Sequence, residues 1–271
     1  MSGGDPRHYG VAMADNRARS ETVAALSGLD LPTPDAVVRY APHEDGIVDV
    51  HLGRSGQMTR PLVVLLHGGF WKQAHDRRHT RAVAAALVAE GFVVATPEYR
   101  RVGGAGGWPE TAEDVDRALA ALPDLLTGLG VTAEGTTTLL GHSAGGHLAL
   151  WLANRPHPVD RVVALAPVGD LRSAARARLG DGATQALLGG EPDEVPDRYD
   201  AADPLTRLTD RPACEIRLVH GREDHIVPPS LSEGLVAAHT WLDLRVLDGA
   251  DHFDVMNPTS AAWPEVLAAL R

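Results

Sequence analysis

The pentapeptide Gly-His-Ser-Ala-Gly occupies residues 141–145, between an apolar run and a stretch with the pattern of a helix. The run at 136–140 predicts a strand, and residues 146–152 predict a helix. A strand that turns directly into a helix needs unusual backbone angles and close contact between the two elements, which glycine tolerates best. We therefore expect a strand–turn–helix unit with Ser143 at its apex.

A serine at such an apex faces the substrate, which makes Ser143 the candidate nucleophile. The five-residue string alone can arise by chance in a chain of 271 residues, because Gly, Ser and Ala are common. Its position between a strand and a helix is what gives the pattern weight.

Short apolar runs recur along the chain and alternate with helical patterns. Runs that are apolar on both faces are typical of parallel strands buried between two layers of helices. Residues 47–52 alternate instead and predict an early antiparallel edge strand. The repeated units indicate an α/β fold with a mostly parallel, doubly wound sheet and helices on both faces. The expected strands are 62–66, 92–95, 137–140, 162–166, 216–219 and 244–247, and the expected helices are 80–90, one after Glu110 marked by Val115, Leu119 and Leu122, and 263–270.

Two regions depart from this alternation within what we expect to be one domain, residues 1–271. Residues 1–34 form an N-terminal extension with a possible helix at 17–26. Residues 169–212 lie between two predicted strands and are too long for an ordinary loop. We interpret them as a helical cap inserted beside the active site.

The composition is that of an ordinary globular protein, with 44% hydrophobic and 23% charged residues. The net charge of −11 disfavours nucleic acid as a partner, and no apolar run is long enough to span a membrane. Residues 1–10 show no secretory signal, and the single cysteine, Cys214, cannot form an internal disulfide. We therefore expect a cytoplasmic protein. Lys72 is the only lysine, so a serine–lysine or Schiff-base mechanism would have to use it.

A serine nucleophile needs a base, and the base needs an acid to hold its tautomer. In a fold with a nucleophile elbow, these groups follow in the order Ser, Asp or Glu, His, each in a loop after a strand. Asp224 follows the predicted strand at 216–219, and His252 follows the one at 244–247. The sequence therefore predicts the catalytic triad Ser143, Asp224 and His252.

Neighbouring residues compete for these roles. Glu223 is an alternative acid, although in an extended turn its side chain points the other way. His225 adjoins the acid and not the last strand, which favours a solvated loop residue. Asp251 and Asp254 flank the candidate base, and they fit a role in capping or solvating its loop. Cys214 opens an apolar strand and fits a small buried core residue.

The segment His-Gly-Gly-Phe-Trp at 67–71 follows the first strong strand and predicts an oxyanion hole. Glycines there allow successive N–H groups to turn toward one point. We expect the donors to be the N–H groups of Gly69, Phe70 and Ala144, the last directly after the nucleophile. Alone, the segment would fit an ordinary turn between a strand and a loop.

His75 and His79 stand four residues apart near His67 and raise the hypothesis of a metal site. The sequence has no intervening glutamate of the His-Glu-x-x-His kind and no evident third ligand. We interpret both as solvated histidines at a helix start, and expect no catalytic metal.

From about residue 51 to the C-terminus, the chain resembles the α/β-hydrolase superfamily. HGGFW, GHSAGGHLA around Ser143 and DHFD around His252 are similar to the kynurenine formamidase (arylformamidase) group, in which a tyrosine is common at the position of Phe70. The resemblance implies hydrolysis of N-formyl-L-kynurenine to kynurenine and formate, a step of tryptophan catabolism, without a cofactor. In that reaction Ser143 attacks the formyl carbon and His252 passes the proton to the aniline nitrogen.

Some of these residues fit more than one role. Trp71, like Phe70, is a candidate substrate-binding residue that restricts the acyl group to formyl or acetyl, or else it packs in the core. A carboxylesterase for small acyl groups would use the same site, and a non-catalytic relative would lack a triad member. The cap charges can bind a zwitterionic head group or simply face solvent; they are Arg172, Arg176, Arg178 and Asp181. The sequence does not define the oligomeric state.

Overall fold

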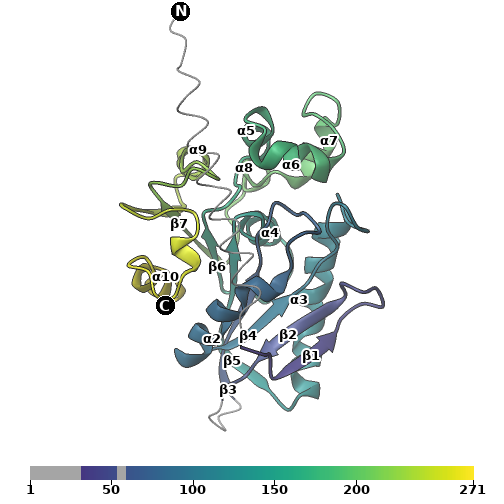
Figure 1. The fold of residues 1–271 in the computed structure, drawn as a ribbon, viewed down its shortest axis with the longest axis vertical. Coiled ribbons are helices and arrows are strands. Elements are labelled where there is room, and N and C mark those ends of the chain that lie inside the picture. The colour runs from purple at the N-terminus through teal and green to yellow at the C-terminus, as the bar shows by residue number, and fades with distance from the viewer. Residues whose placement is uncertain (1–31, 54–58) are drawn as a thin grey trace, which may run out of the picture.

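The computed structural model describes residues 32–53 and 59–271 of the chain (Figure 1). An eight-stranded sheet runs through it in the order β1-β2-β4-β3-β5-β6-β7-β8. The predicted helix at 17–26 and nearly all of the N-terminal extension lie outside the described residues. The strands are β1 (Ala36–Arg39), β2 (Ile47–His51), β3 (Thr59–Leu66), β4 (Val93–Pro97), β5 (Thr132–His142), β6 (Arg161–Leu165), β7 (Glu215–Gly221) and β8 (Asp243–Leu247).

The six strands β3 to β8 are parallel, which confirms the mostly parallel sheet that the apolar runs predict. β2 pairs antiparallel with β4, as expected, but it is not the edge strand. β1 pairs outside it, with Val37 opposite Asp49. Residues 36–39, Ala-Val-Val-Arg, contain only three apolar residues in a row, which is too short a run to identify a strand.

Helices cover both faces of the sheet, as the doubly wound fold requires. On β3, Leu62, Val64 and Leu66 face one core cluster, and Val63 and Leu65 face the other. The first cluster includes α3 (Glu110–Gly128), α4 (Ala144–Leu152) and α9 (Ser230–Ala238), and the second includes α2 (Arg81–Ala89) and α10 (Trp263–Leu270). Two short 3₁₀ helices are η1 (Arg77–Thr80) and η2 (Asp254–Met256). The last helix has the bounds that the sequence predicts, with a proline in its first turn.

The segment between β6 and β7 contains four helices, which confirms a helical insertion at this point. They are α5 (Leu171–Arg176), α6 (Leu179–Leu188), α7 (Pro196–Ala202) and α8 (Pro204–Arg207). Figure 1 shows α5, α6 and α7 gathered at one end of the molecule. We call residues 169–212 the cap.

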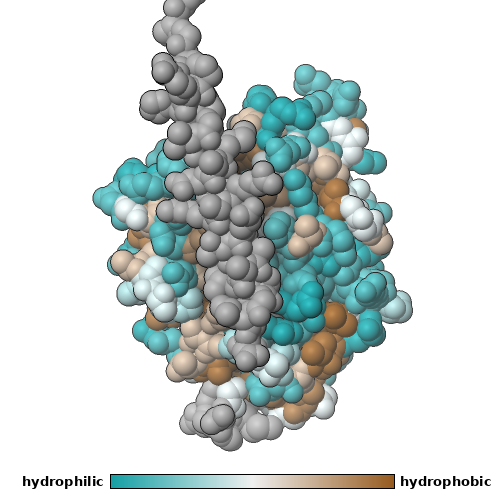
Figure 2. Space-filling view, viewed as in Figure 1, coloured by the Kyte–Doolittle hydropathy of each residue, from teal (hydrophilic) through white to brown (hydrophobic). Residues whose placement is uncertain are grey.

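The view in Figure 2 shows mainly hydrophilic residues over the cap, with hydrophobic ones scattered below it. Val37, on β1, is the one large hydrophobic side chain that is exposed among the described residues. No helix in the described part of the chain is both long and apolar enough to cross a membrane.

Candidate active site

Ser143 lies at the sharp turn between β5 and α4, with φ 55° and ψ −116°. A positive φ is unfavourable for any residue other than glycine, by about 1–3 kcal/mol, and persists only where the surroundings enforce it. The two glycines of the motif, Gly141 and Gly145, let β5, β3 and the start of α4 pack closely together at this turn. A Cβ on Gly141 would lie 2.2 Å from the oxygen of Gly145, and one on Gly145 would lie 2.1 Å from the oxygen of Leu66. The strand–turn–helix unit forms as the sequence predicts.

Asp224 and His252 form the closest polar contact of the site. His252 Nδ1 donates to Asp224 Oδ2 at 2.6 Å, and both side chains are buried. Asp224 Oδ1 accepts from the N–H groups of Ile226 and Val227 at 2.9 and 2.8 Å, which fixes the carboxylate. Burial alone would raise the pKa of Asp224, but the neighbouring His252 charge and the hydrogen bonds from His220 and His252 hold it well below its usual range. The carboxyl group of Asp224 is therefore ionised at neutral pH.

His220, at the end of β7, is a second histidine on this carboxylate. Its Nε2 lies 3.2 Å from Asp224 Oδ2 and 2.8 Å from the oxygen of Val227, while its Nδ1 lies 2.8 Å from Ser232 Oγ. Because both groups near Nε2 are acceptors, Nε2 carries the proton and Nδ1 accepts from the serine hydroxyl. Sequence reasoning did not assign His220 a role; the signal was a polar residue at the end of an apolar strand.

His142, which directly precedes the candidate nucleophile Ser143, contacts the candidate base His252. The centroids of the His142 and His252 rings lie 4.5 Å apart, and His142 Nε2 donates to the carbonyl oxygen of His252 at 2.9 Å. Three loops from distant parts of the chain thus meet at the carboxyl ends of β5, β7 and β8. His142 thus contacts the loop of His252; the motif contains this residue, but sequence reasoning did not single it out.

The predicted oxyanion segment, residues 67–71, lies against the candidate nucleophile Ser143. A Cβ on Gly68 would lie 3.2 Å from Ser143 Cβ. Gly69, Phe70 and Trp71 all have positive φ, at 109°, 52° and 55°. The N–H groups of Gly69 and Phe70 donate to no backbone carbonyl of the described residues, and Ala144 begins α4, so its N–H has no partner inside the helix. These three donors are available to a bound anion.

A buried network of ion pairs and hydrogen bonds around Glu98 holds His67, the first residue of this segment. His67 Nε2 and Arg101 Nη1 contact Glu98 Oε1 at 2.8 and 2.9 Å, and the N–H of Arg77 donates to Glu98 Oε2 at 3.0 Å. Burial would raise the pKa of Glu98, but the charges and hydrogen bonds of these groups lower it to about 2. The Tyr99 ring stacks on His67 with the ring centroids 4.3 Å apart.

Trp71 is 1% exposed and packs edge-on against the His147 ring, with the centroids 5.2 Å apart. This position favours the core-packing interpretation of Trp71 over that of a wall of the substrate pocket. Phe70 is only partly buried and packs at the margin of the same core cluster.

Residues 48–239 match the BD-FAE family. The chain belongs to this family. It is 26% identical to esterase LipC of Mycobacterium tuberculosis over 220 residues, which cover 73% of this chain and 54% of that protein. It is 30% identical to a kynurenine formamidase of Salmo salar over 112 residues, which cover 41% of this chain and 36% of that protein. The chain thus spans about half, or less, of the length of these relatives.

Esterase B of Lactobacillus rhamnosis has the same fold as this BD-FAE family member. The two superpose with a TM-score of 0.74 over 97% of this chain and 91% of that one, at 18% identity. The superposition supports the α/β-hydrolase fold that the sequence motifs imply.

The competing residues of this BD-FAE family member have other surroundings. Glu223 and His225 are exposed. Asp251 Oδ1 accepts from the N–H of Phe253 at 2.8 Å, and Asp254 Oδ2 accepts from the N–H of Asp251 at 2.8 Å, so both shape the loop around His252. Cys214 is buried, with Sγ 3.7 Å from the oxygen of Ala153.

The described residues contain no group of three or more side chains suited to a metal ion. His79 packs edge-on against His67, with the ring centroids 5.6 Å apart, and His75 packs beside Gly69. His75 and His79, for which the sequence analysis expected no metal, therefore lie beside residues 67–69.

The cap charges bind one another or face solvent. Arg172 pairs with Asp200 at 2.8 Å, and Arg178 contacts Glu191 at 3.4 Å. Arg176 and Asp181 are exposed.

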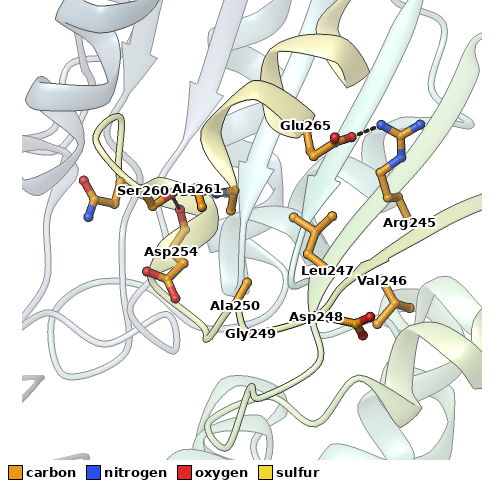
Figure 3. Close-up of a pocket in the computed structure, with 12 residues that line it drawn as sticks. Arg245, Val246, Leu247, Asp248, Gly249, Ala250, Asp254, Ser260, Ala261 and Glu265 are labelled. Atoms are coloured by element: carbon orange, nitrogen blue, oxygen red, sulfur yellow. Dashed lines mark hydrogen bonds and ion pairs between the residues drawn. The ribbon is translucent and has the colours of Figure 1, made fainter.

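A cavity of about 600 Å³ lies between β8 and the start of α10 (Figure 3). The ion pair of Arg245 and Glu265 crosses one side of it, and Asp254 lines another. No triad candidate lines it, so it is separate from the site.

Proposed function

We propose that this protein is a serine hydrolase that cleaves a small acyl group from an amide or ester. Ser143 is the nucleophile, His252 the base, and Asp224 the acid that orients it. The observation that carries the proposal is the buried 2.6 Å hydrogen bond between His252 Nδ1 and Asp224 Oδ2. It leaves Nε2 of the neutral ring as the acceptor for a hydroxyl proton.

The proposed reaction has two halves. His252 Nε2 takes the proton of Ser143 as Oγ attacks the acyl carbon, and the N–H groups of Gly69, Phe70 and Ala144 bind the oxyanion. The imidazolium then protonates the leaving nitrogen or oxygen, and an acyl-enzyme remains. A water molecule, deprotonated by the same ring, releases the acid and restores Ser143. This chemistry uses protein groups and water, so we propose no cofactor and no metal.

The first substrate that we propose is N-formyl-L-kynurenine, which would yield kynurenine and formate. The match to a kynurenine formamidase supports it, as do the HGGFW, GHSAGG and DHFD motifs. Phe70 keeps the backbone donor of the segment but lacks the hydroxyl of the tyrosine common in that group. We propose that Phe70, and not the buried Trp71, meets the acyl group.

The second candidate is a carboxylesterase of broad specificity for small acyl groups. The longer match to esterase LipC favours it, because 73% of this chain takes part. Both candidates predict a small-molecule substrate, and the net charge of −11 disfavours nucleic acid. We keep a cytoplasmic location as part of the proposal.

Steady-state hydrolysis decides between the candidates. Wild type and Ser143→Ala are compared on N-formyl-L-kynurenine, p-nitrophenyl acetate and p-nitrophenyl butyrate. A kcat/KM for formylkynurenine far above those for the esters supports the formamidase, and the reverse supports the esterase. In either case Ser143→Ala loses orders of magnitude. Activity that survives this substitution, or inactivity of the wild type on all three substrates, overturns the proposal.

A further inference from the structure

Two backbone segments with left-handed angles meet at the edge of the site. The first is the oxyanion segment, where three residues in a row, Gly69 to Trp71, have positive φ. Two of these are aromatic residues, for which such angles are unfavourable. Local sequence therefore does not explain the conformation, and contacts from elsewhere must hold it.

The second segment is a turn of the cap, residues 178–182. Arg178 and Asp181 have φ 50° and 60°, and the glycines between and after them, Gly180 and Gly182, have φ 59° and 81°. This turn also contains two residues other than glycine in an unfavourable conformation. We call it the cap turn.

The two segments touch at Gly180. Lys72 Nζ donates to the carbonyl oxygen of Gly180 at 2.7 Å, across 108 positions of the chain. The Phe70 ring packs directly on the same glycine, since a Cβ there would lie 2.7 Å from Cγ and Cδ1 of the ring. Gly180 is therefore required both by its φ and by the ring.

Lys72 connects the cap turn to the oxyanion segment through its backbone and its side chain. Its N–H donates to the oxygen of Gly69 at 3.0 Å and closes the segment, while its ammonium group binds the cap. Val102 holds the next part of the chain, because its N–H donates to the oxygen of Trp71 at 2.8 Å and its own oxygen accepts from the N–H of Gln73 at 2.9 Å. The segment is thus held by the loop that follows β4 and by the cap.

We propose that the cap turn holds the oxyanion segment in its donor geometry and, by placing the Phe70 ring, sets the length of acyl chain that the site accepts. Lys72 is a positioning residue, and Gly180 determines acyl specificity. This inference rests on the proposed serine hydrolase function.

The first test uses Lys72. Lys72→Met keeps the length of the side chain but removes the charged donor, so kcat for p-nitrophenyl acetate falls about 10- to 100-fold while KM changes little, because a misplaced oxyanion donor acts on the transition state. Lys72→Arg keeps a donor and recovers part of the loss. Equal kcat in Lys72→Met and the wild type, or no recovery in Lys72→Arg, overturns the role of Lys72.

The second test uses Gly180. In Gly180→Ala the new methyl group displaces the Phe70 ring from its position against the cap turn, so the ratio of kcat/KM for butyrate to that for acetate changes at least about fivefold. Gly189→Ala is the matched control, since Gly189 has φ 82° in the same cap but faces the Arg198 side chain. In a Phe70→Ala background, Gly180→Ala has no further effect on the ratio.

The outcomes separate the two proposals. If Ser143→Ala retains activity, the hydrolase mechanism itself fails. If Ser143→Ala is inactive but Gly180→Ala leaves the butyrate-to-acetate ratio unchanged, or changes it no more than Gly189→Ala does, the role of the cap turn fails alone. Thermal unfolding of each variant confirms that the compared proteins are folded.

Discussion

His142 donates a hydrogen bond from Nε2 to the backbone carbonyl oxygen of His252 at 2.9 Å. The residue before the proposed nucleophile thus holds the loop that carries the proposed base. Burial, together with the nearby His252 charge, keeps the pKa of His142 well below its usual value, so the ring stays neutral at neutral pH and the hydrogen bond is constant there.

His142→Phe keeps a ring against His252 but removes the donor. We expect kcat to fall about 10-fold, because a small displacement of the base weakens proton transfer. The unpaired buried carbonyl lowers the free energy of unfolding by about 1–3 kcal/mol. Ester hydrolysis and urea unfolding measure the two effects. Wild-type values in both would show that His142 does not position the base.

Asp224→Asn removes the charge that faces His252. Because an amide can hold the ring in the wrong tautomer, kcat falls about 10³- to 10⁴-fold with little change in KM. Glu223→Gln is the control, since this neighbour is exposed and was the alternative acid; its kcat stays within about twofold of the wild type. A larger loss in Glu223→Gln than in Asp224→Asn would reverse the assignment of the acid.

Gly145→Ala and Gly128→Ala test the packing of the elbow. The methyl group on residue 145 would lie 2.1 Å from the oxygen of Leu66, so we expect a loss of at least about 2 kcal/mol in stability together with lost activity. Nothing lies within 4 Å of a Cβ at Gly128, the last residue of α3. Alanine there should raise the free energy of unfolding by about 0.5 kcal/mol. Equal unfolding midpoints for the two variants would contradict this account.

His147 makes stability depend on pH. Its Nε2 donates to the oxygen of Ala202 at 3.0 Å, and burial lowers its pKa from 6.5 to about 4. As pH falls below 6.5, the unfolded chain binds a proton at His147 that the folded protein does not, so stability is full above pH 6.5 and is lost toward pH 4. Between pH 7.5 and pH 5 this amounts to about 2 kcal/mol.

His147→Gln keeps a donor for Ala202 without a group that titrates. Urea unfolding at both pH values should show that the wild type loses about 2 kcal/mol more than the variant. The same loss in both proteins would mean that His147 does not carry this dependence.

The central strands of the parallel sheet were predictable because they are apolar on both faces, as in β4 and β6 and most clearly in β3 from Leu62 to Leu66. The turn at Ser143 was predictable because a sharp strand-to-helix turn brings backbone atoms close together, and only glycine fits at positions 141 and 145. β1 was not, because its three apolar residues followed by an arginine are too few to give a periodic signal.

The loop positions of Asp224 and His252 follow from the strand order, so the sequence alone predicted these two residues as partners. The roles of His142 and His220 depend on rings that meet across three loops, and no local pattern encodes such contacts. The contact of Lys72 with Gly180 joins residues 108 positions apart, so no local pattern predicts it either.

The most direct test of the account is covalent labelling of the nucleophile. A fluorophosphonate reacts when a serine oxygen attacks phosphorus and fluoride leaves, and peptide mass spectrometry locates the adduct. We predict one adduct per chain on Ser143, none on Ser143→Ala, and labelling slowed at least about 100-fold in His252→Ala. An adduct on another residue, or labelling of Ser143→Ala at the wild-type rate, would contradict the central claim that Ser143 is the nucleophile.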